Sequence, residues 1–300
     1  MKTPPPLAAP VRELVPLAPF TTWKIGGPAR WLAEPSGAEL APLLSWAQEE
    51  EVPVWFLGRG SNVLIPDAGL PGLVILTRNS LCGLSRVGDH IHAESGVSLM
   101  RLSKFAASEG FRGFEFMIGI PGTVGGALAV NAGLTVFRPR DMSSVTEDFE
   151  VITLRGVRET LSMGDVHACY RHTDLLDGGR FVASARFRLE ETGDPAVISR
   201  ETLEHLHERK RKQPLDKPTA GSTFKSVPEG KGAGFYVEQA GLKGFRIGAA
   251  QVSNKHANWI ENLGGATAAD VRELISVIQS RVSAETGVRL DPEVIFLQEK

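Results

Sequence analysis

Long apolar runs are missing from this sequence of 300 residues. A helix that crosses a membrane needs about 20 consecutive apolar residues, and the longest apolar stretches here, such as 54–57 and 73–76, are only a few residues long. The N-terminal segment is interrupted by Pro4, Pro5 and Pro6, so it lacks the apolar core of a secretory signal peptide. We therefore expect neither a membrane segment nor a signal peptide.

An excess of charge is also missing, and cysteine is scarce. The 33 basic and 35 acidic side chains leave a net charge of −2, so no global positive field exists to hold nucleic acid or an anionic bilayer. The only two cysteines, Cys82 and Cys169, match no metal-ligand spacing. These absences predict a reduced cytoplasmic protein with no metal site and no nucleic-acid or membrane partner.

Glycine, in contrast, is abundant and clustered. Hydrophobic residues make up 42% and charged residues 23% of the chain, as in ordinary soluble globular proteins. The length predicts two domains. The 32 glycines gather in a few segments, and such clusters mark places where the backbone turns sharply or approaches a ligand closely.

Patterning predicts a mixture of strands and helices. Apolar or alternating runs predict strands over 29–34, 53–57, 73–76, 91–93, 183–189 and 293–297, and Arg155-Gly156 predicts a hairpin between 149–154 and 157–161. Capping signals predict helices over 36–50 from Ser36 and Glu39, over 98–109, from Asp194-Pro195, and from Thr267. We place a domain boundary near residue 193.

The loop Gly58-Arg59-Gly60-Ser61-Asn62 directly follows a predicted buried strand. Successive N–H groups in such a loop form a concave anion site that suits a pyrophosphate. The spacing is not that of a Rossmann fingerprint, because Val63 occupies the third glycine position. A simple tight turn between two strands is the alternative.

A second glycine-rich stretch covers 119–126 and continues to Asn131. It is too rich in glycine for a good helix interior and too apolar for an exposed loop. Backbone pressed against a flat apolar ligand explains both properties, and a close packing turn is the alternative.

Other polar clusters are ambiguous by themselves. Arg171, beside Tyr170, presents a guanidinium fork that suits a carboxylate or phosphate, but it also fits a surface position. Ser222 lies between glycine and threonine, yet the Gly-x-Ser-x-Gly nucleophile pattern is broken by Phe224. His256 and Glu293 carry no signal alone.

Taken in order, these segments resemble the UDP-N-acetylenolpyruvoylglucosamine reductases, the MurB family. The resemblance covers nearly the whole chain after the Pro-rich segment. The matching pieces are 23–29, 57–62, 113–127, 170–171, 220–225, 240–244, 251–253, 255–258 and 291–293. The length is similar to the compact second type of the family, which lacks an extra substrate-capping segment.

The resemblance implies an α+β protein. It implies a Pro-rich arm over 1–20 and an FAD-binding domain of the vanillyl-alcohol-oxidase (PCMH) type over 21–192, with lobes of about 21–78 and 79–192. A C-terminal α+β substrate domain would cover 193–300. It also implies non-covalent FAD, NADPH as hydride donor, and UDP-N-acetylglucosamine-enolpyruvate as the substrate in peptidoglycan precursor synthesis. A monomer is the default expectation.

The resemblance also assigns roles to residues. Arg171 and Glu293 would stabilise the enolate that forms when hydride reaches the vinyl carbon, with Glu293 kept protonated by burial, and Ser222 would donate the proton. Substrate contacts fall on Tyr170, Lys225 and His256. FAD contacts fall on Gly58, Arg59, Gly60, Ser61, Asn62, Gly119, Ile120, Pro121, Gly122, Gly125 and Gly126.

Two positions depart from the family pattern. Ser226 replaces a substrate-contacting asparagine, and Thr173 replaces a serine while keeping the hydroxyl. Two other functions remain open: a related FAD-dependent oxidase with another substrate, and a non-catalytic sugar-nucleotide binder. Flavin oxidases often bind flavin covalently through His or Cys, and neither predicted flavin segment contains one.

Overall fold

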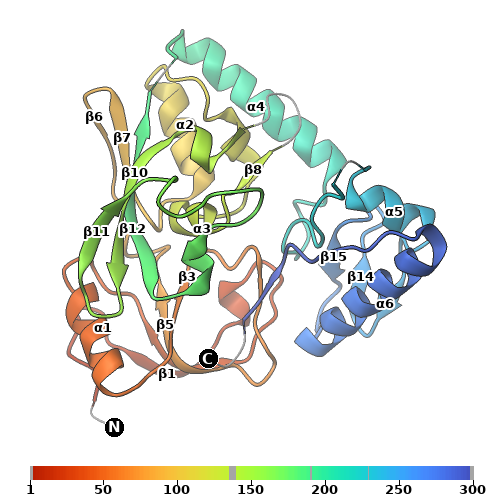
Figure 1. The fold of residues 1–300 in the computed structure, drawn as a ribbon, viewed down its shortest axis with the longest axis horizontal. Coiled ribbons are helices and arrows are strands. Elements are labelled where there is room, and N and C mark those ends of the chain that lie inside the picture. Colours follow the sequence, from red (N-terminus) through yellow and green to blue (C-terminus); the bar gives the residue numbers. More distant parts are fainter. Residues whose placement is uncertain (1–2, 135–139, 190, 229, 298–300) are drawn as a thin grey trace. The chain divides into compact units, whose positions relative to one another are not determined.

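The computed structural model describes residues 3–134, 140–189, 191–228 and 230–297 (Figure 1). The chain forms two compact units, each assembled from separate segments of the sequence. The first unit comprises 1–13, 31–59 and 72–208, and the second comprises 14–30, 60–71 and 209–300. The predicted boundaries of the arm and the two domains stay predictions, and residues 1–2, 135–139, 190, 229 and 298–300 of those ranges lie outside the described residues.

A five-stranded antiparallel sheet has the order β11-β10-β12-β7-β6. Its strands are β6 (Leu84–Val87), β7 (His90–Glu94), β10 (Thr146–Thr153), β11 (Arg158–Leu161) and β12 (Arg180–Arg188). Phe149 pairs with Leu161 across the predicted hairpin, which is confirmed, and with Ala185 on the other side.

A four-stranded sheet has the order β1-β2-β5-β3, in which β3 and β5 are parallel. Its strands are β1 (Arg12–Pro16), β2 (Pro28–Ala33), β3 (Val54–Leu57) and β5 (Leu70–Leu76). Helix α1 (Leu40–Glu49) packs on it through a buried cluster that includes Leu43, Leu44 and Trp46. Within the Pro-rich segment 1–20, the structure contains the strand β1 and a short 3₁₀ helix, η1 (Ala18–Phe20).

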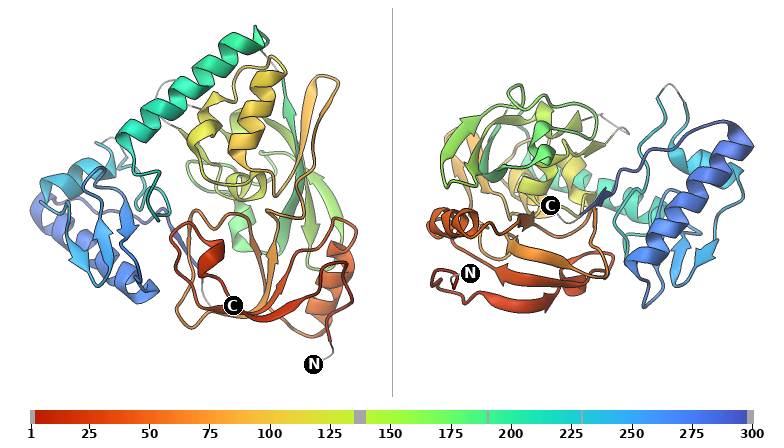
Figure 2. Two further views of the ribbon diagram at one scale, coloured as in Figure 1. Left: turned by 180° about the vertical axis from the view of Figure 1, so that it is seen from behind. Right: turned by 60° about the horizontal axis from the view of Figure 1, so that its bottom comes forward.

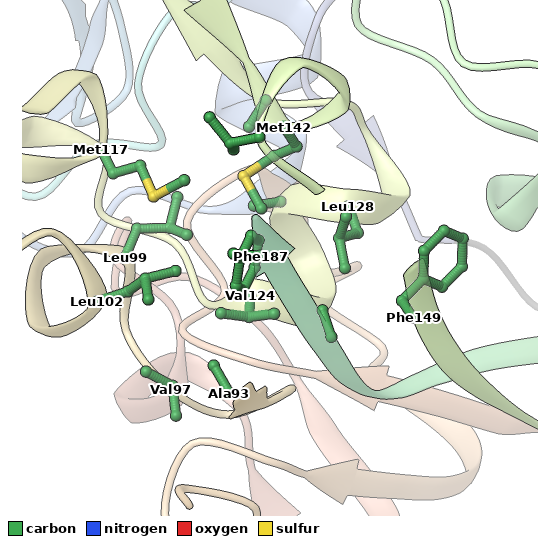
Figure 3. Packing of buried hydrophobic residues seen from close by; sticks show 14 of the residues in the cluster. Ala93, Val97, Leu99, Leu102, Met117, Val124, Leu128, Met142, Phe149 and Phe187 are labelled. Atoms are coloured by element: carbon green, nitrogen blue, oxygen red, sulfur yellow. The ribbon is translucent and has the colours of Figure 1, made fainter. Parts of the chain in front are cut away.

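The core of the first unit lies between the five-stranded sheet and two helices, α2 (Leu99–Ser108) and α3 (Val124–Ala129). Figure 3 shows Val124 and Leu128 of α3 beside Phe187 of β12, with Leu99 and Leu102 of α2 nearby. Ser98 caps α2 by accepting a hydrogen bond from the N–H of Arg101 at 3.2 Å. This packing fixes the start of α3, which carries two glycines of the second glycine-rich stretch.

The second unit has its own core, built on the antiparallel sheet β13-β14-β15 and helix α6 (Figure 2). Apolar residues of α6 at Val271, Leu274, Ile278 and Val282 are buried. The elements are α5 (Ala233–Gln239), α6 (Ala268–Thr286), β4 (Val63–Leu64), β13 (Arg246–Ile247), β14 (Ala250–Val252), β15 (Ile260–Asn262) and β16 (Ile295–Phe296). Strands β16 and β4 pair in parallel, so the end of the described chain lies beside the residues that follow Asn62.

The remaining elements are short, apart from α4. They are α4 (Pro195–Lys212), β8 (Gly133–Leu134), β9 (Arg140–Asp141), and the 3₁₀ helices η2 (Glu115–Gly119), η3 (Met142–Ser144) and η4 (Asp174–Asp177). No helix in the described ranges combines the length and hydrophobicity that crossing a membrane requires.

Most predicted elements are confirmed, including the Thr267 cap of α6 and the Asp194 cap of α4, and the structure adds that Thr267 forms a capping box with Asp270. The predicted capping box at Ser36 is wrong. The carboxylate of Glu39 accepts hydrogen bonds from the N–H and hydroxyl of Ser36, both at 2.8 Å, and α1 begins only at Leu40. The N–H of Glu39 donates to the backbone carbonyl of Ser36 at 3.1 Å and not to its hydroxyl, so Ser36 does not cap the helix.

Candidate active site

The two glycine-rich segments contact each other inside the first unit. Gly58 follows β3 and lies directly against the side chain of Thr123. A Cβ atom built on Gly58 would lie 3.1 Å from Cγ2 and 3.2 Å from Cβ of Thr123, and closer still to its hydroxyl. Only glycine allows this approach, so the packing brings together two segments that the sequence separates by more than sixty residues.

The 119–126 segment is anchored by backbone hydrogen bonds on one side. The carbonyl of Gly122 accepts from the N–H of Leu99 at 3.1 Å, and the N–H of Gly125 donates to the carbonyl of Ser95 at 2.9 Å. A Cβ on Gly125 would lie 2.9 Å from the Cβ of Ser95. This glycine is therefore required by close packing within the protein and not by contact with a ligand. Its neighbour Gly126 is exposed, and a Cβ there would meet the Thr123 hydroxyl oxygen at 3.8 Å, an ordinary van der Waals contact.

The sequence predicted that the glycine-rich stretch 119–126 is not helical, and this prediction is wrong at the C-terminal end of the stretch. Val124–Ala129 is helical although it contains Gly125 and Gly126. Burial of Val124, Ala127 and Leu128 in the core outweighs the low helix propensity of two glycines. The helix thus carries one exposed glycine, Gly126, a few residues after exposed Pro121 and half-buried Ile120.

In the second unit, the loop of residues 60–62 carries three backbone N–H groups in succession. Gly60 has a φ of +58°, and a Cβ there would lie 2.7 Å from the carbonyl oxygen of Phe20. Its own carbonyl accepts a hydrogen bond from the N–H of Thr22 at 3.1 Å. Within the described residues, the N–H groups of Gly60, Ser61 and Asn62 have no hydrogen-bond partner.

These features fit FAD. Successive free N–H groups suit the pyrophosphate, and exposed glycine backbone with apolar neighbours suits the face of an isoalloxazine ring. Taken separately, residues 60–62 of the second unit could hold phosphates, and Ile120, Pro121 and Gly126 of the first unit could face a ring.

Tyr170 and Arg171 form the tip of a tight turn in the first unit. The backbones of Cys169 and His172 exchange hydrogen bonds of 3.0 and 3.3 Å, and Arg171 takes a left-handed φ of +57°. Its Nη2 donates to the carbonyl of Gly133 at 2.5 Å, and its guanidinium carbon lies 5.0 Å from the centre of the Tyr170 ring. Both contacts restrict where the guanidinium can point.

Asn131 holds this turn and was not identified as a site residue from the sequence. It is buried, with a φ of +42°. Its Nδ2 donates to the carbonyl of Cys169 at 3.1 Å and to the carboxylate of Asp141 at 3.2 Å, while its Oδ1 accepts from the N–H of Ser143. Thr173 adds a second anchor, because its buried hydroxyl donates to the carbonyl of Ala129 at 2.7 Å. The hydroxyl retained at this departure from the family pattern therefore has a structural partner.

The second unit brings the Ser222 segment and the Glu293 segment together. The N–H of Glu293 donates to the carbonyl of Thr223 at 2.8 Å, and the N–H of Lys225 donates to the carbonyl of Asp291 at 2.9 Å. Asn62 joins the same cluster, since its Nδ2 donates to the carbonyl of Glu293 at 3.2 Å. Three predicted site residues from distant parts of the sequence thus share one hydrogen-bonded cluster.

His256 is linked to that cluster through Asn258. Its Nδ1 accepts a hydrogen bond from the N–H of Asn258 at 3.2 Å, which assigns the proton of the neutral ring to Nε2. Burial, and secondarily the charge of Lys243, lower the pKa of His256. The neutral imidazole therefore presents an N–H donor at neutral pH.

The structure distributes the predicted residues over both units. Tyr170 and Arg171 lie in the first unit with Gly58, Arg59 and the 119–126 segment. The second unit contains Gly60, Ser61, Asn62, Ser222, Lys225, His256 and Glu293. Among the described residues, no group of three or more His, Cys, Asp or Glu side chains is arranged to hold a metal ion.

Comparison with known proteins covers nearly the whole chain. A family model described as "UDP-N-acetylenolpyruvoylglucosamine reductase, C-terminal domain" matches residues 213–297, and an "FAD binding domain" model matches residues 33–162. Together they confirm the predicted fold class, an FAD-binding domain followed by a C-terminal domain of mixed helix and strand.

Several relatives are named UDP-N-acetylenolpyruvoylglucosamine reductase. The one from Synechococcus sp. (strain WH7803) is 43% identical over 286 residues, which cover 95% of this chain and 92% of the relative. The one from Alkalilimnicola ehrlichii is 42% identical over 290 residues, covering 96% and 95%. A crystal structure of UDP-N-acetylenolpyruvylglucosamine reductase (MurB) from Thermus caldophilus superimposes with a TM-score of 0.78 at 33% identity, covering 96% of this chain and 99% of that one.

Agreement of this extent, in sequence and in fold, leaves no large part of the chain unaccounted for. The chain belongs to the UDP-N-acetylenolpyruvoylglucosamine reductase (MurB) family.

Proposed function

We propose that this protein reduces the enolpyruvyl ether of UDP-N-acetylglucosamine-enolpyruvate to UDP-N-acetylmuramate, with NADPH as reductant and non-covalent FAD as cofactor. Family membership over almost the full length supports the reaction. The observation in the structure that carries the proposal is the hydrogen-bonded pairing of the Ser222 and Glu293 segments, with Glu293 N–H donating to Thr223 at 2.8 Å. A proton donor and an acidic residue on paired segments suit protonation of a carbon next to a carboxylate.

The chemistry supplied by bound FAD is transfer of a hydride, taken from NADPH, to the terminal carbon of the enolpyruvyl group. Negative charge then develops on the adjacent carbon and its carboxylate. We assign Arg171 to the stabilisation of this charge, because its fork matches a carboxylate, its turn is anchored by Asn131, and its guanidinium is held by the carbonyl of Gly133. Glu293, half-buried, would stabilise the same charge as a hydrogen-bond donor in its protonated form.

We assign the proton transfer to Ser222. Its segment is held on one side by Asn258 and on the other by 291–293, so its hydroxyl is carried by a fixed backbone. Lys225, three residues on, would assist by placing positive charge near the hydroxyl. Tyr170, Lys225 and His256 are assigned to substrate binding, with His256 offering its Nε2–H as a donor.

Separate measurement of the two half-reactions tests this assignment. Reduction of the flavin by NADPH needs no proton from Ser222, whereas its reoxidation by the enolpyruvyl substrate does. Ser222→Ala should leave the first nearly intact and slow the second by about 100- to 10,000-fold, the usual contribution of general-acid catalysis. Ser222→Cys should recover part of the rate, and Ser280→Ala, an exposed serine on α6, serves as the matched control.

Stopped-flow traces of flavin absorbance report both rates. Equal slowing of both half-reactions would indicate damaged folding or flavin binding. An unchanged oxidative half would remove Ser222 as the donor and make Glu293 the leading candidate.

The mode of cofactor attachment has its own test. Acid precipitation should release the yellow colour into the supernatant, and colour kept in the pellet would indicate a covalent flavin and favour the oxidase alternative. The proposal also places the enzyme in the cytoplasm. It further predicts a monomer, and equilibrium sedimentation of the holoenzyme would check this oligomeric state.

A further inference from the structure

We infer that Asn258 is a positioning residue that holds the Ser222 segment and the His256 ring in register for proton transfer. The inference rests on the proposed role of Ser222. Asn258 lies between β14 and β15, and only 7% of it is exposed to solvent. A buried amide at such a position must have its hydrogen bonds satisfied within the protein.

The side chain of Asn258 forms the two backbone hydrogen bonds that a neighbouring strand would otherwise form with Phe224. The N–H of Phe224 donates to Oδ1 at 3.0 Å, and Nδ2 donates to the carbonyl of Phe224 at 2.8 Å. One amide side chain thereby satisfies both backbone polar groups of a buried residue. The main-chain carbonyl of Asn258 also accepts from the N–H of Thr223 at 2.8 Å.

The opposite edge of the same segment is paired with 291–293. Phe224 forms a bridge with Pro292, and the flanking hydrogen bonds come from Glu293 and Lys225. The backbone that immediately follows Ser222 is therefore held from two sides, by Asn258 and by the segment that carries Glu293. Loss of the Asn258 side would free the direction in which Ser222 points.

Asn258 also reaches His256. Its N–H donates to Nδ1 of the imidazole at 3.2 Å, so the same residue fixes the ring tautomer. A single buried residue thus couples the proposed substrate-binding imidazole to the proposed proton donor. Misplacement of a reacting group by about 1 Å can cost about 100-fold in rate.

The substitution Asn258→Asp separates a positioning role from a purely structural one. An ionised carboxylate still accepts from the N–H of Phe224, but it presents a second acceptor to the Phe224 carbonyl and repels it. A protonated carboxyl can donate there and restores the pattern. Burial raises the pKa of a carboxyl group, so protonation of the introduced acid falls within an accessible pH range.

We expect the oxidative half-reaction of Asn258→Asp to be slowed by about 100-fold relative to the wild type at about pH 8. The slowing should shrink by at least about tenfold at about pH 5.5, where the acid is protonated. Reduction of the flavin by NADPH should stay within about twofold of the wild type throughout. Asn254→Asp, an exposed position in the same loop, should show no such pH dependence.

The outcomes are distinct. A normal oxidative half at high pH, or an equal slowing of both halves at every pH, would overturn the inference. If the Asp variant does not fold at high pH, Asn258→Gln provides the same comparison at one pH, because it keeps the amide but displaces it by one methylene. If Ser222→Ala leaves the oxidative half unchanged, the proposed role of Ser222 itself fails, whatever the Asn258 variants show.

Discussion

Adding one methyl group at each of two glycines, Gly58 and Gly126, should give opposite results. A Cβ at Gly58 would lie 3.1 Å from Cγ2 and 3.2 Å from Cβ of Thr123, and closer to its hydroxyl. A Cβ at Gly126 would have the Thr123 hydroxyl oxygen, 3.8 Å away, as its nearest neighbour, and Gly126 is exposed. The first substitution therefore disturbs the protein, and the second disturbs only what binds there.

The magnitudes follow from these distances. Overpacking of a close contact typically costs about 1–3 kcal/mol, so Gly58→Ala should lower the free energy of unfolding of the apoprotein by that amount. Gly126 lies inside α3, where alanine is favoured over glycine by about 1 kcal/mol. Gly126→Ala should leave the apoprotein equally stable or more stable, yet weaken FAD binding by about tenfold, or ~1.4 kcal/mol.

Urea unfolding of the apoprotein and fluorescence titration with FAD measure the two quantities. Thr123→Ala removes the two nearest atoms that oppose a Cβ at Gly58, so the double variant should recover about 1 kcal/mol of the stability lost in Gly58→Ala. An apoprotein of the Gly58→Ala variant that is as stable as the wild type would refute the packing argument. Unchanged FAD affinity in Gly126→Ala would refute the placement of the flavin against α3.

Three further predictions concern Arg171, Asn131 and His256. Arg171→Lys keeps the charge but loses the fork, so stopped-flow absorbance should show normal flavin reduction by NADPH and substantially slower reoxidation by substrate. Asn131→Ala removes the anchors at Cys169 and Ser143; the apoprotein should lose about 1–3 kcal/mol in urea unfolding, and reoxidation should slow more than reduction. The pKa of His256 is lower in the folded protein than in the unfolded chain, so the unfolded chain binds more protons near the ordinary histidine pKa. The contribution of neutral His256 to the free energy of unfolding is therefore present above about pH 6.5 and is lost as the pH falls. His256→Asn, which keeps an acceptor for the N–H of Asn258, should show a smaller loss of apoprotein stability between about pH 7 and 5, and an identical loss would contradict the argument.

Local patterns predicted most elements because local contacts form them. Thr267 and Asp270 cap α6 by bonding to each other's backbone within one turn, and the alternation along β12 reflects its buried and exposed faces. The same reasoning failed at Ser36, where the Glu39 carboxylate bonds to Ser36 but the helix begins only at Leu40. The carboxylate of Glu39 also accepts a hydrogen bond from the N–H of Ala8 at 2.6 Å, a contact that no local pattern encodes.

The reactive residues of the candidate site stay predictions, and the residues that hold their segments in place were not identified from the sequence. Ser222, Arg171, Glu293 and His256 were proposed because the segments that resemble the family carry them. Asn131 and Asn258 lie within or beside those motifs, yet their function is to bond to backbone 38 and 34 residues away, respectively. Only the folded chain shows that pairing, although a buried asparagine inside a motif is a signal that can be followed in other sequences.

The pairing of β4 with β16 has a consequence for how the protein is made. Val63 and Leu64 directly follow residues 60–62, and their strand partners are Ile295 and Phe296. During synthesis from the N-terminus, β4 is therefore made long before its partner strand β16 exists. Closing so long a loop also makes this pairing entropically costly and slow. Residues 60–62, to which we assign the FAD pyrophosphate, are therefore followed by a strand that is paired only late, and partial nascent chains carry this segment without β16.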